Sequence, residues 1–305
     1  MTNLSSTIVV AGKSSADIQS AINKLPAEGG EVIVKAGKYI CSNYILINRD
    51  HVTLRGEGNA TVLRLADNAN SPVIIMGQDA AVPTAAVKNI HISNLVIDGN
   101  RANQRSEYWR GKSALRNNGI SIRRCEDCSV EAVTVYSTAS GGLVAELKCR
   151  RLTVRDFTSF DNEFDGLAAY QTEDSWFTGL KLHNNHGAGL SFDIKFNNNT
   201  ISNAVLADNA KVGVFIRDSN DNVFQDLQIH NSGEHGIFLA QVDADNTKSA
   251  NGNSFIGVSV SGSNGAGIRV NDSSCANNSV VNSHFTGNTR GCIEGVIAQS
   301  ENICQ

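Results

Sequence analysis

Residues 160–193, FDNEFDGLAAYQTEDSWFTGLKLHNNHGAGLSFD, contain one full period of the repeat that decides the fold. Gly166 and Gly189 lie 23 residues apart, and each precedes a tetrapeptide whose first and third residues are apolar. This alternation predicts a short strand with one buried face. The same glycine recurs with spacings of 23, 24, 23, 24, 23 and 31 residues, at Gly119, Gly142, Gly166, Gly189, Gly213, Gly236 and Gly267.

One repeat of this length cannot bury its own apolar side, so successive repeats must stack into a solenoid. The second half of each repeat is rich in β-branched and aromatic residues, as in SWFTGLKLH, which predicts further strands rather than a helix. Asn-rich turns before each glycine are expected to share amide hydrogen bonds between neighbouring repeats. The sequence therefore predicts an all-β protein, a parallel β-helix with regular coils over residues 119–291.

The N-terminal third is less regular. Residues 14–25, SSADIQSAINKL, have a Ser/Asp start and apolar residues at helical spacing, which predicts an amphipathic helix that caps the open end. GGEVIVKAGKYI and the short apolar segments after it are expected to form the first coils. The widest glycine spacing predicts an insertion in the loop QVDADNTKSANGN. Residues 1–305 are expected to form a single β-helix domain.

Composition and charge exclude several classes of protein. A net charge of −4 argues against a nucleic-acid partner. No apolar run approaches the roughly 18 residues that span a bilayer, so no membrane partner is expected. The start, MTNLSSTIVVAGKSS, lacks the basic and apolar segments of a secretory signal, and the compartment stays open. Most of the seven scattered cysteines are predicted to be small core residues rather than parts of a disulfide framework.

Two short segments were weighed as metal sites. Cys125 and Cys128 have the spacing of a metal or redox pair, but neither a second such pair nor a nearby His accompanies them. Asp243 and Asp245 offer calcium ligands, but the rest of a calcium-binding loop is missing. Packing is the better interpretation of the cysteines and a solvated loop that of the aspartates, so no cofactor or metal is expected.

Strand alternation places the second and fourth residues after each glycine on the outside of the solenoid. The second column is mostly small or apolar and receives no role. The fourth column is polar or ionisable over five consecutive coils, at Arg123, Glu146, Tyr170, Asp193 and Arg217. Coils stack about 4.8 Å apart, so this column predicts a groove with Glu146, Tyr170 and Asp193 as catalytic residues and Arg123 and Arg217 as substrate contacts. The alternative is an ordinary solvent-facing column with weak surface pairs.

Residues 99–118 leave the repeat and form a basic, aromatic loop. Five cations, Arg101, Arg105, Arg110, Lys112 and Arg116, oppose one anion, Glu107, which gives a local charge of 5 − 1 = +4. Aromatic faces pack on sugar rings and cations pair with carboxylates, so the loop suits an anionic polysaccharide. The predicted substrate contacts are Arg101, Tyr108, Trp109, Arg110 and Lys112. An ordinary solvated loop is the alternative.

His186 and His235 lie in turns beside the predicted groove. Both are predicted to contact substrate. Each is also a secondary candidate for the catalytic acid or base, because imidazole titrates near neutral pH. Surface residues without a role are the alternative.

A helix followed by GGEVIVKAGKYICS resembles the start of the pectate-lyase-type right-handed β-helix superfamily. The segments HVTLRGEGNATVLRL, LVIDGNRANQ and LTVRDFTSFDNEFDGL are similar to the catalytic module of mannuronan C5-epimerases. This resemblance covers roughly residues 15–195. It implies a right-handed β-helix, a carbohydrate-binding groove along the polar column, and action on alginate-like polymers outside the cell.

The catalytic Asp-Pro-His-Glu motif of that family is absent. Its Asp falls at Val144 and its His at Glu146, the Asp of the next coil falls at Tyr170, and a second His falls near Ala188. The resemblance therefore implies the family's β-helix fold and the location of its groove, but not its catalytic residues. The expected function is epimerase- or lyase-like action on a uronic-acid-containing glycan by C5 proton abstraction. The alternatives are a glycoside hydrolase with Glu146 and Asp193 as acid and base, and a carbohydrate-binding β-helix without activity.

Overall fold

The computed structural model describes residues 6–108, 115–242 and 248–305. The chain divides into two compact units, Met1–Thr158 and Ser159–Gln305. In each unit, short strands pair in parallel with strands one coil away and form three sheets. One α-helix occurs in the described part of the chain. This architecture confirms the predicted parallel β-helix, while the expectation of one domain over residues 1–305 stays a prediction.

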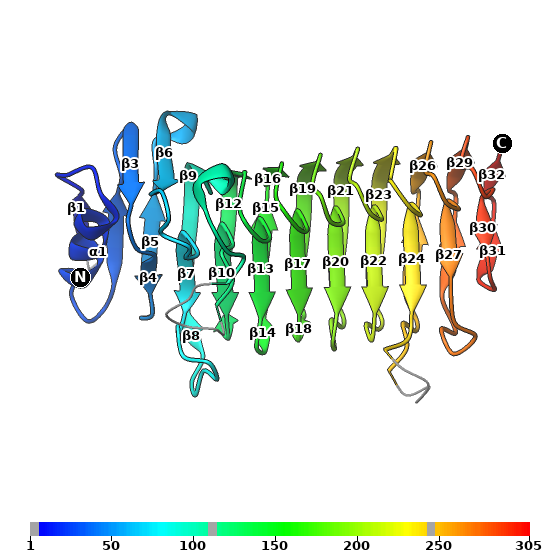
Figure 1. Cartoon of the computed structure of the whole chain (residues 1–305). Coiled ribbons are helices and arrows are strands. Elements are labelled where there is room, and N and C mark those ends of the chain that lie inside the picture. Colours follow the sequence, from blue (N-terminus) through cyan, green and yellow to red (C-terminus); the bar gives the residue numbers. More distant parts are fainter. Residues whose placement is uncertain (1–5, 109–114, 243–247) are drawn as a thin grey trace. The chain divides into compact units, whose positions relative to one another are not determined.

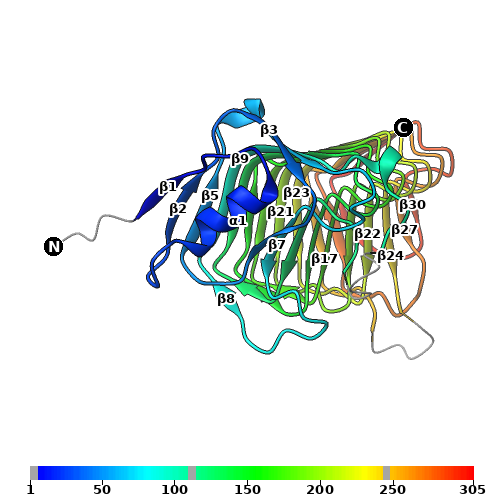
Figure 2. The same ribbon diagram turned by 60° about the vertical axis from the view of Figure 1, so that its left-hand side comes forward.

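The first unit contains the predicted helix, α1 (Ser15–Asn23), after a short strand, β1 (Thr7–Val9). Ser14 caps its N-terminus, and Ser14 and Asp17 form a reciprocal capping box. The helix buries Ile18 and Ile22, and it packs against β4 (Ile45–Ile47). Figure 2 shows α1 lying across the N-terminal coils of this unit. The expected capping helix over residues 14–25 is therefore confirmed.

Strands of the first unit form the coils predicted from its apolar segments. Ile45, Ile74, Ile120 and Leu143 are register partners along one sheet, which consists of β4, β7, β10 and β13. The remaining strands are β1 (Thr7–Val9), β2 (Gly30–Ile33), β3 (Gly37–Cys41), β5 (Val52–Arg55), β6 (Thr61–Leu65), β8 (Val87–Lys88), β9 (Ile90–Asp98), β11 (Cys125–Glu126), β12 (Ser129–Tyr136), β14 (Cys149–Arg150) and β15 (Thr153–Arg155), beside β7 (Ile74–Gly77), β10 (Ile120–Arg123) and β13 (Leu143–Glu146).

Strands of the second unit repeat the predicted pattern. Its central sheet consists of β17 (Leu167–Tyr170), β20 (Leu190–Asp193), β22 (Val214–Arg217), β24 (Ile237–Ala240), β27 (Ile268–Val270) and β30 (Ile293–Glu294), which Figure 1 shows side by side in this order. The others are β18 (Thr172–Glu173), β19 (Trp176–His183), β21 (Thr200–Ala207), β23 (Val223–His230), β25 (Ser254–Ile256), β26 (Ser259–Ser261), β28 (Ser279–Val281), β29 (His284–Thr286), β31 (Ala298–Ser300) and β32 (Ile303–Cys304). β16 (Thr158–Phe160) begins at the last residue of the first unit.

The expected asparagine ladders are present in the second unit. In one ladder the amide of Asn162 donates to Asn185 at 2.8 Å, and that of Asn185 donates to Asn209 at 3.0 Å. A second ladder joins four buried asparagines at 3.1, 2.9 and 3.1 Å, Asn199, Asn222, Asn253 and Asn278. Each side chain satisfies its neighbour's buried amide, so the ladders fix the register of the coils. The wide glycine spacing falls between β24 and β25, as predicted.

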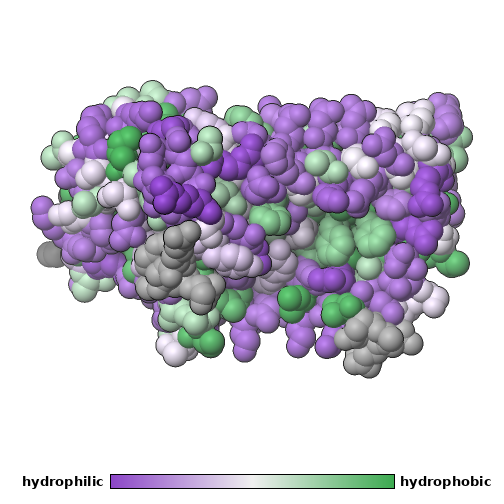
Figure 3. All heavy atoms as spheres, viewed as in Figure 1, coloured by the Kyte–Doolittle hydropathy of each residue, from purple (hydrophilic) through white to green (hydrophobic). Residues whose placement is uncertain are grey.

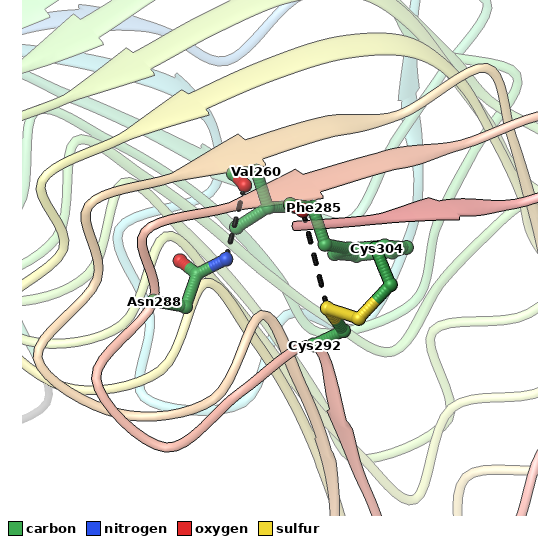
Figure 4. Close-up of a disulfide and its surroundings, with 5 residues drawn as sticks. All are labelled: Val260, Phe285, Asn288, Cys292 and Cys304. Carbon is green, nitrogen blue, oxygen red and sulfur yellow. Dashed lines mark hydrogen bonds between the residues drawn. A yellow bond between two sulfur atoms is a disulfide. The ribbon is translucent and has the colours of Figure 1, made fainter.

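Most of the cysteines match the prediction. Five are buried free thiols, Cys41, Cys125, Cys128, Cys149 and Cys275, which confirms their role as core residues. Cys292 and Cys304 instead form a disulfide with Cα atoms 5.9 Å apart, and Figure 4 shows it beside Phe285 in the last coil. No feature of the sequence signalled this pair, because the two residues lie 12 positions apart in sequence and only the course of the last coil brings them together.

Candidate active site

The part of the polar column in the first unit is a buried ion pair. Arg123 ends β10 and Glu146 ends β13, and the two are register partners. Arg123 Nε donates to Glu146 Oε1 at 2.8 Å, and its Nη1 and Nη2 donate to the carbonyls of Gln78 and Ala81 at 3.2 and 3.5 Å. The Arg123 side chain is 1% exposed. The expectation that Arg123 is exposed and contacts substrate is therefore wrong, because the segment after β7 covers its side chain.

The Glu146 side chain is partly exposed to solvent, and its carboxyl group suits a catalytic proton donor. Its side chain is 30% exposed. Burial raises the pKa of its carboxyl, and the charges of Arg123 and Arg116 oppose this rise only in part. A carboxyl with a raised pKa retains its proton closer to neutral pH, which suits a proton donor.

The basic loop approaches this pair within the first unit. The Arg116 charge lowers the pKa of Glu146, and the expectation that the loop borders a groove stays a prediction. Arg116 also pairs with Glu107 and lies over the Tyr108 ring, with Cζ 4.8 Å from the ring centre. Arg101 begins a 3-10 helix, η2 (Arg101–Asn103). Trp109, Arg110 and Lys112 lie outside the described residues, and the substrate contacts expected of the loop stay predictions.

The part of the column in the second unit brings together Tyr170, Asp193 and Arg217. Tyr170 and Asp193 are register partners on β17 and β20. Asp193 Oδ2 accepts from Arg217 Nε at 3.0 Å and Nη2 at 2.5 Å, and Asp193 Oδ1 accepts from the Ile194 amide at 2.7 Å. The Asp193 side chain is only 6% exposed. Asp193 is therefore not the expected solvent-facing carboxylate, and its geometry suits holding Arg217.

Arg217 is the accessible cation of this cluster. Its side chain is 38% exposed, and its Nη1 has no hydrogen-bond partner within the described ranges. The hydrogen bond to Asp193 raises the Arg217 pKa, and the charges of Asp193 and Tyr170 add to the rise. Arg217 thus lies close enough to act on Tyr170 and offsets the Asp193 charge beside it. Glu146 belongs to the other unit, so a joint centre of Glu146, Tyr170 and Asp193 stays a prediction.

Backbone strain follows both carboxylates of the column. Leu147 and Lys148 have φ values of 66° and 72°, and Ile194 and Lys195 have values of 51° and 63°. The turns after Arg123, Tyr170 and Arg217 each begin with a single residue of positive φ. Positive φ is unfavourable for a β-branched residue such as Ile194, and such strain concentrates at functional sites. The strain marks Glu146 and Asp193 as constrained positions.

The two predicted histidines differ in what they can do. His186 Nδ1 lies 3.4 Å from the Glu163 carboxylate. His235 Nδ1 accepts a hydrogen bond from the Ala266 amide at 2.9 Å, and burial lowers the His235 pKa. Because a backbone amide only donates, the neutral His235 ring must carry its proton on Nε2. The structure thus contradicts His235 as a general base, while its contact with substrate stays a prediction, with Nε2–H as the donor.

The second outward column contains two residues that the sequence prediction missed. Phe215 on β22 and Phe238 on β24 are partly exposed register partners, with ring centres 5.9 Å apart and planes 16° apart. The tetrapeptides VFIR and IFLA were the signal, since a large aromatic at an outward strand position has no core to fill.

The described residues offer no group of three or more His, Cys, Asp and Glu side chains placed to hold a metal ion. Asp243 and Asp245, the aspartates considered for calcium, lie outside those residues. No helix in the described ranges is long and apolar enough to cross a membrane.

Parallel coils of short strands and amide ladders define a parallel β-helix. The family described as "Right handed beta helix region" matches residues 118–303. The chain belongs to this right-handed β-helix family.

The chain is also similar to mannuronan C5-epimerase AlgE4 of Azotobacter vinelandii. It is 30% identical over 170 residues, which cover 53% of this chain and 30% of that protein. The A-module of AlgE4 superposes with a TM-score of 0.57 at 19% identity, covering 94% of each chain. An alginate lyase from Paenibacillus superposes with a TM-score of 0.60 at 8% identity, covering 96% of this chain and 97% of the lyase. The chain thus spans less than a third of the curated relative, and the structural likenesses show the fold.

Proposed function

We propose that this chain is an enzyme that acts on a uronic-acid-containing polysaccharide by epimerase- or lyase-type chemistry. The cluster of Tyr170, Asp193 and Arg217 carries the proposal. The similarity to a mannuronan C5-epimerase supports it. Both reactions begin when the C5–H bond of a uronate breaks, the proton passes to a base, and the electron pair moves toward the adjacent carboxylate.

Arg217 has the position and charge to stabilise that carboxylate. Two of its nitrogens are held by the buried Asp193 carboxylate, which fixes the guanidinium plane and leaves Nη1 to bind substrate. An Arg held in this way loses little freedom when it binds a carboxylate. Asp193 therefore acts as a positioning residue.

Tyr170 is the proton-transferring group of the proposal. A tyrosine between two unpaired carboxylates would resist ionisation, because a third negative charge would form beside them. Within the second unit, however, Arg217 balances the Asp193 charge and lies near enough to interact with Tyr170. Tyr170, once ionised to its phenolate, can then take the C5 proton and become a neutral phenol. Return of a proton to the opposite face gives epimerisation, and expulsion of the group on C4 gives a lyase.

The test uses polymannuronate, polyguluronate and polygalacturonate, together with acidic heteropolysaccharides that contain both uronic acids and neutral sugars. Absorbance at 235 nm detects the unsaturated product of a lyase, and proton NMR in D₂O detects deuterium at C5 from an epimerase. Tyr170→Phe removes only a hydroxyl and is expected to abolish product and exchange, whereas Tyr136→Phe, in the first unit, is the control and should retain both. The proposal fails if wild type acts on none of the polymers or if Tyr170→Phe remains fully active.

The raised pKa of Glu146 favours a second candidate, a glycoside hydrolase with Glu146 as general acid. Asp193 does not suit the role of catalytic base that the hydrolase alternative gives it, because its oxygens accept hydrogen bonds from Arg217 and the Ile194 amide. Release of reducing sugar without absorbance at 235 nm, lost in Glu146→Gln, would identify this activity. Retention of glycans without any turnover would indicate a binding protein.

A further inference from the structure

A hollow of about 460 Å³ lies on the second unit, beside the Tyr170 cluster. Phe215 and Phe238 form one wall, and the small residues Ala188 and Ser191 leave space in front of them. Figure 3 shows a hydrophobic patch over β22 and β24 within a mainly hydrophilic surface. The patch is thus a recess with an aromatic wall, and recesses of this size hold small ligands.

Phe215 and Phe238 form a partly exposed aromatic pair, the Phe215–Phe238 platform, which also contacts Arg217 and His235. Parallel rings in contact lie roughly 3.5 Å apart, so a centre-to-centre distance of 5.9 Å requires a large offset between Phe215 and Phe238. Part of each face is therefore left uncovered by the other ring. His235 stacks on Phe238 with centres 5.6 Å apart, which supports that ring from the turn before β24. The platform suits the C–H face of a pyranose ring.

The rim of the hollow contains more anions than cations. Glu163, Asp165 and Glu234 oppose Lys211, which gives a formal charge of −3 + 1 = −2 with neutral His186. Lys211 Nζ lies 3.0 Å from Glu234, so its charge is already matched. Carboxylates accept hydrogen bonds from sugar hydroxyls, but they would repel a uronate. The rim therefore favours a neutral sugar.

Arg217 connects this hollow to the proposed catalytic cluster. Its Cζ lies 5.4 Å from the centre of the Phe215 ring, and the same guanidinium is bonded to Asp193. A ligand that stacks on Phe215 would thus place its next sugar beside Arg217. That sugar can be acidic, because Arg217 provides the outward cation there.

We infer that the Phe215–Phe238 platform binds a neutral hexopyranose of a polysaccharide in which neutral sugars neighbour uronic acids. The neutral-sugar subsite stands on its own geometry, and the adjoining uronate rests on the proposed function. The substrate is then a mixed, acidic heteropolysaccharide rather than a pure polyuronate.

A glycan array of neutral, acidic and mixed oligosaccharides tests this inference with the full chain. We expect the retained glycans to contain a neutral hexose. Phe215→Ala and Phe238→Ala should each weaken binding about tenfold, the effect of losing one aromatic contact. Trp176→Ala is the matched control, because Trp176 is 64% exposed on another sheet of the same unit, and it should bind as wild type does.

A second pair of substitutions tests the charge argument. Glu163→Gln with Glu234→Gln changes the rim charge from −2 to 0 by the count above, and it should increase retention of oligouronates relative to neutral glycans. The inference is overturned if no neutral or mixed glycan is retained, if both Phe variants bind as wild type does, or if the double variant leaves the preference unchanged. Binding that depends on Phe238 without turnover of any uronate would remove the proposed catalysis and leave the platform intact.

Discussion

Loss of either partner of the Arg123–Glu146 ion pair in the first unit should lower the stability of the fold, but by different amounts. Glu146→Ala leaves the Arg123 guanidinium, 1% exposed, with only the carbonyls of Gln78 and Ala81. An uncompensated buried charge costs about 3–5 kcal/mol. Arg123→Met leaves a carboxyl that is 30% exposed and whose pKa is already raised, so water or a proton can satisfy it. We expect this variant to lose only about 1–2 kcal/mol, mainly from the two carbonyls that lose a donor.

Urea unfolding followed by far-UV circular dichroism at pH 7 measures these differences. The double variant Arg123→Met with Glu146→Leu should lie within about 2 kcal/mol of wild type, because a packed apolar pair often replaces a buried ion pair without loss. Glu131→Ala is the matched control, since Glu131 and Arg155 form an ion pair with side chains 42% and 51% exposed, and it should cost less than about 1 kcal/mol. A loss in Arg123→Met equal to or larger than that in Glu146→Ala would refute the reasoning.

Four further predictions follow from particular residues. If Glu146 donates a proton in catalysis, activity should fall as the pH rises through the Glu146 pKa. Arg123→Met removes a charge that lowers this pKa, so the alkaline limb of the pH–rate profile should move to higher pH. An alkaline limb that stays in place would contradict the role of Glu146 as proton donor. Ile194→Asn relieves the φ of 51° and should stabilise the fold by about 1 kcal/mol, seen as a higher melting temperature. Reduction of the Cys292–Cys304 disulfide, which closes a 12-residue separation, should cost about 3 kcal/mol, with faster hydrogen exchange confined to β29 and β32. Asn222→Ala interrupts a ladder of buried amides and should cost about 3 kcal/mol in urea unfolding, whereas the exposed Asn264→Ala should change little.

The fold could be predicted because its cause is periodic. Each coil must bury the first and third residues after the glycine, so the alternation appears in sequence at 23 to 24 residues and recurs as the observed register from Leu167 to Ile237. The capping helix was equally local, since Ser14 and Asp17 are three residues apart. Local and repeated signals thus gave the architecture and most strand positions.

The site was only partly predictable, because exposure depends on segments outside the repeat. Alternation correctly gave the direction of the fourth column, but Arg123 is buried by carbonyls of residues 78 and 81, which no period encodes. Asp193 is covered because its neighbour Arg217 folds onto it. Phe215 and Phe238 received no role because the second outward column is mostly small or apolar, although a large aromatic side chain at an outward position has no core to fill.

Arg217 belongs to the proposed catalytic cluster and also contacts the Phe215–Phe238 platform. Phe215→Ala and Phe238→Ala are therefore expected to affect catalysis differently. Its guanidinium is held by Asp193 and lies over the Phe215 ring, so Phe215→Ala removes a sugar contact and also frees Arg217 to reorient. Among the described residues, the Phe238 ring stacks on Phe215 and His235, and neither belongs to the cluster of Tyr170, Asp193 and Arg217. Loss of turnover at saturating substrate in Phe215→Ala, with only weaker binding in Phe238→Ala, would therefore show that one ring serves both the neutral sugar and the placement of Arg217. Equal effects of the two variants on binding alone would instead assign both rings to the platform and leave Asp193 to hold Arg217 by itself.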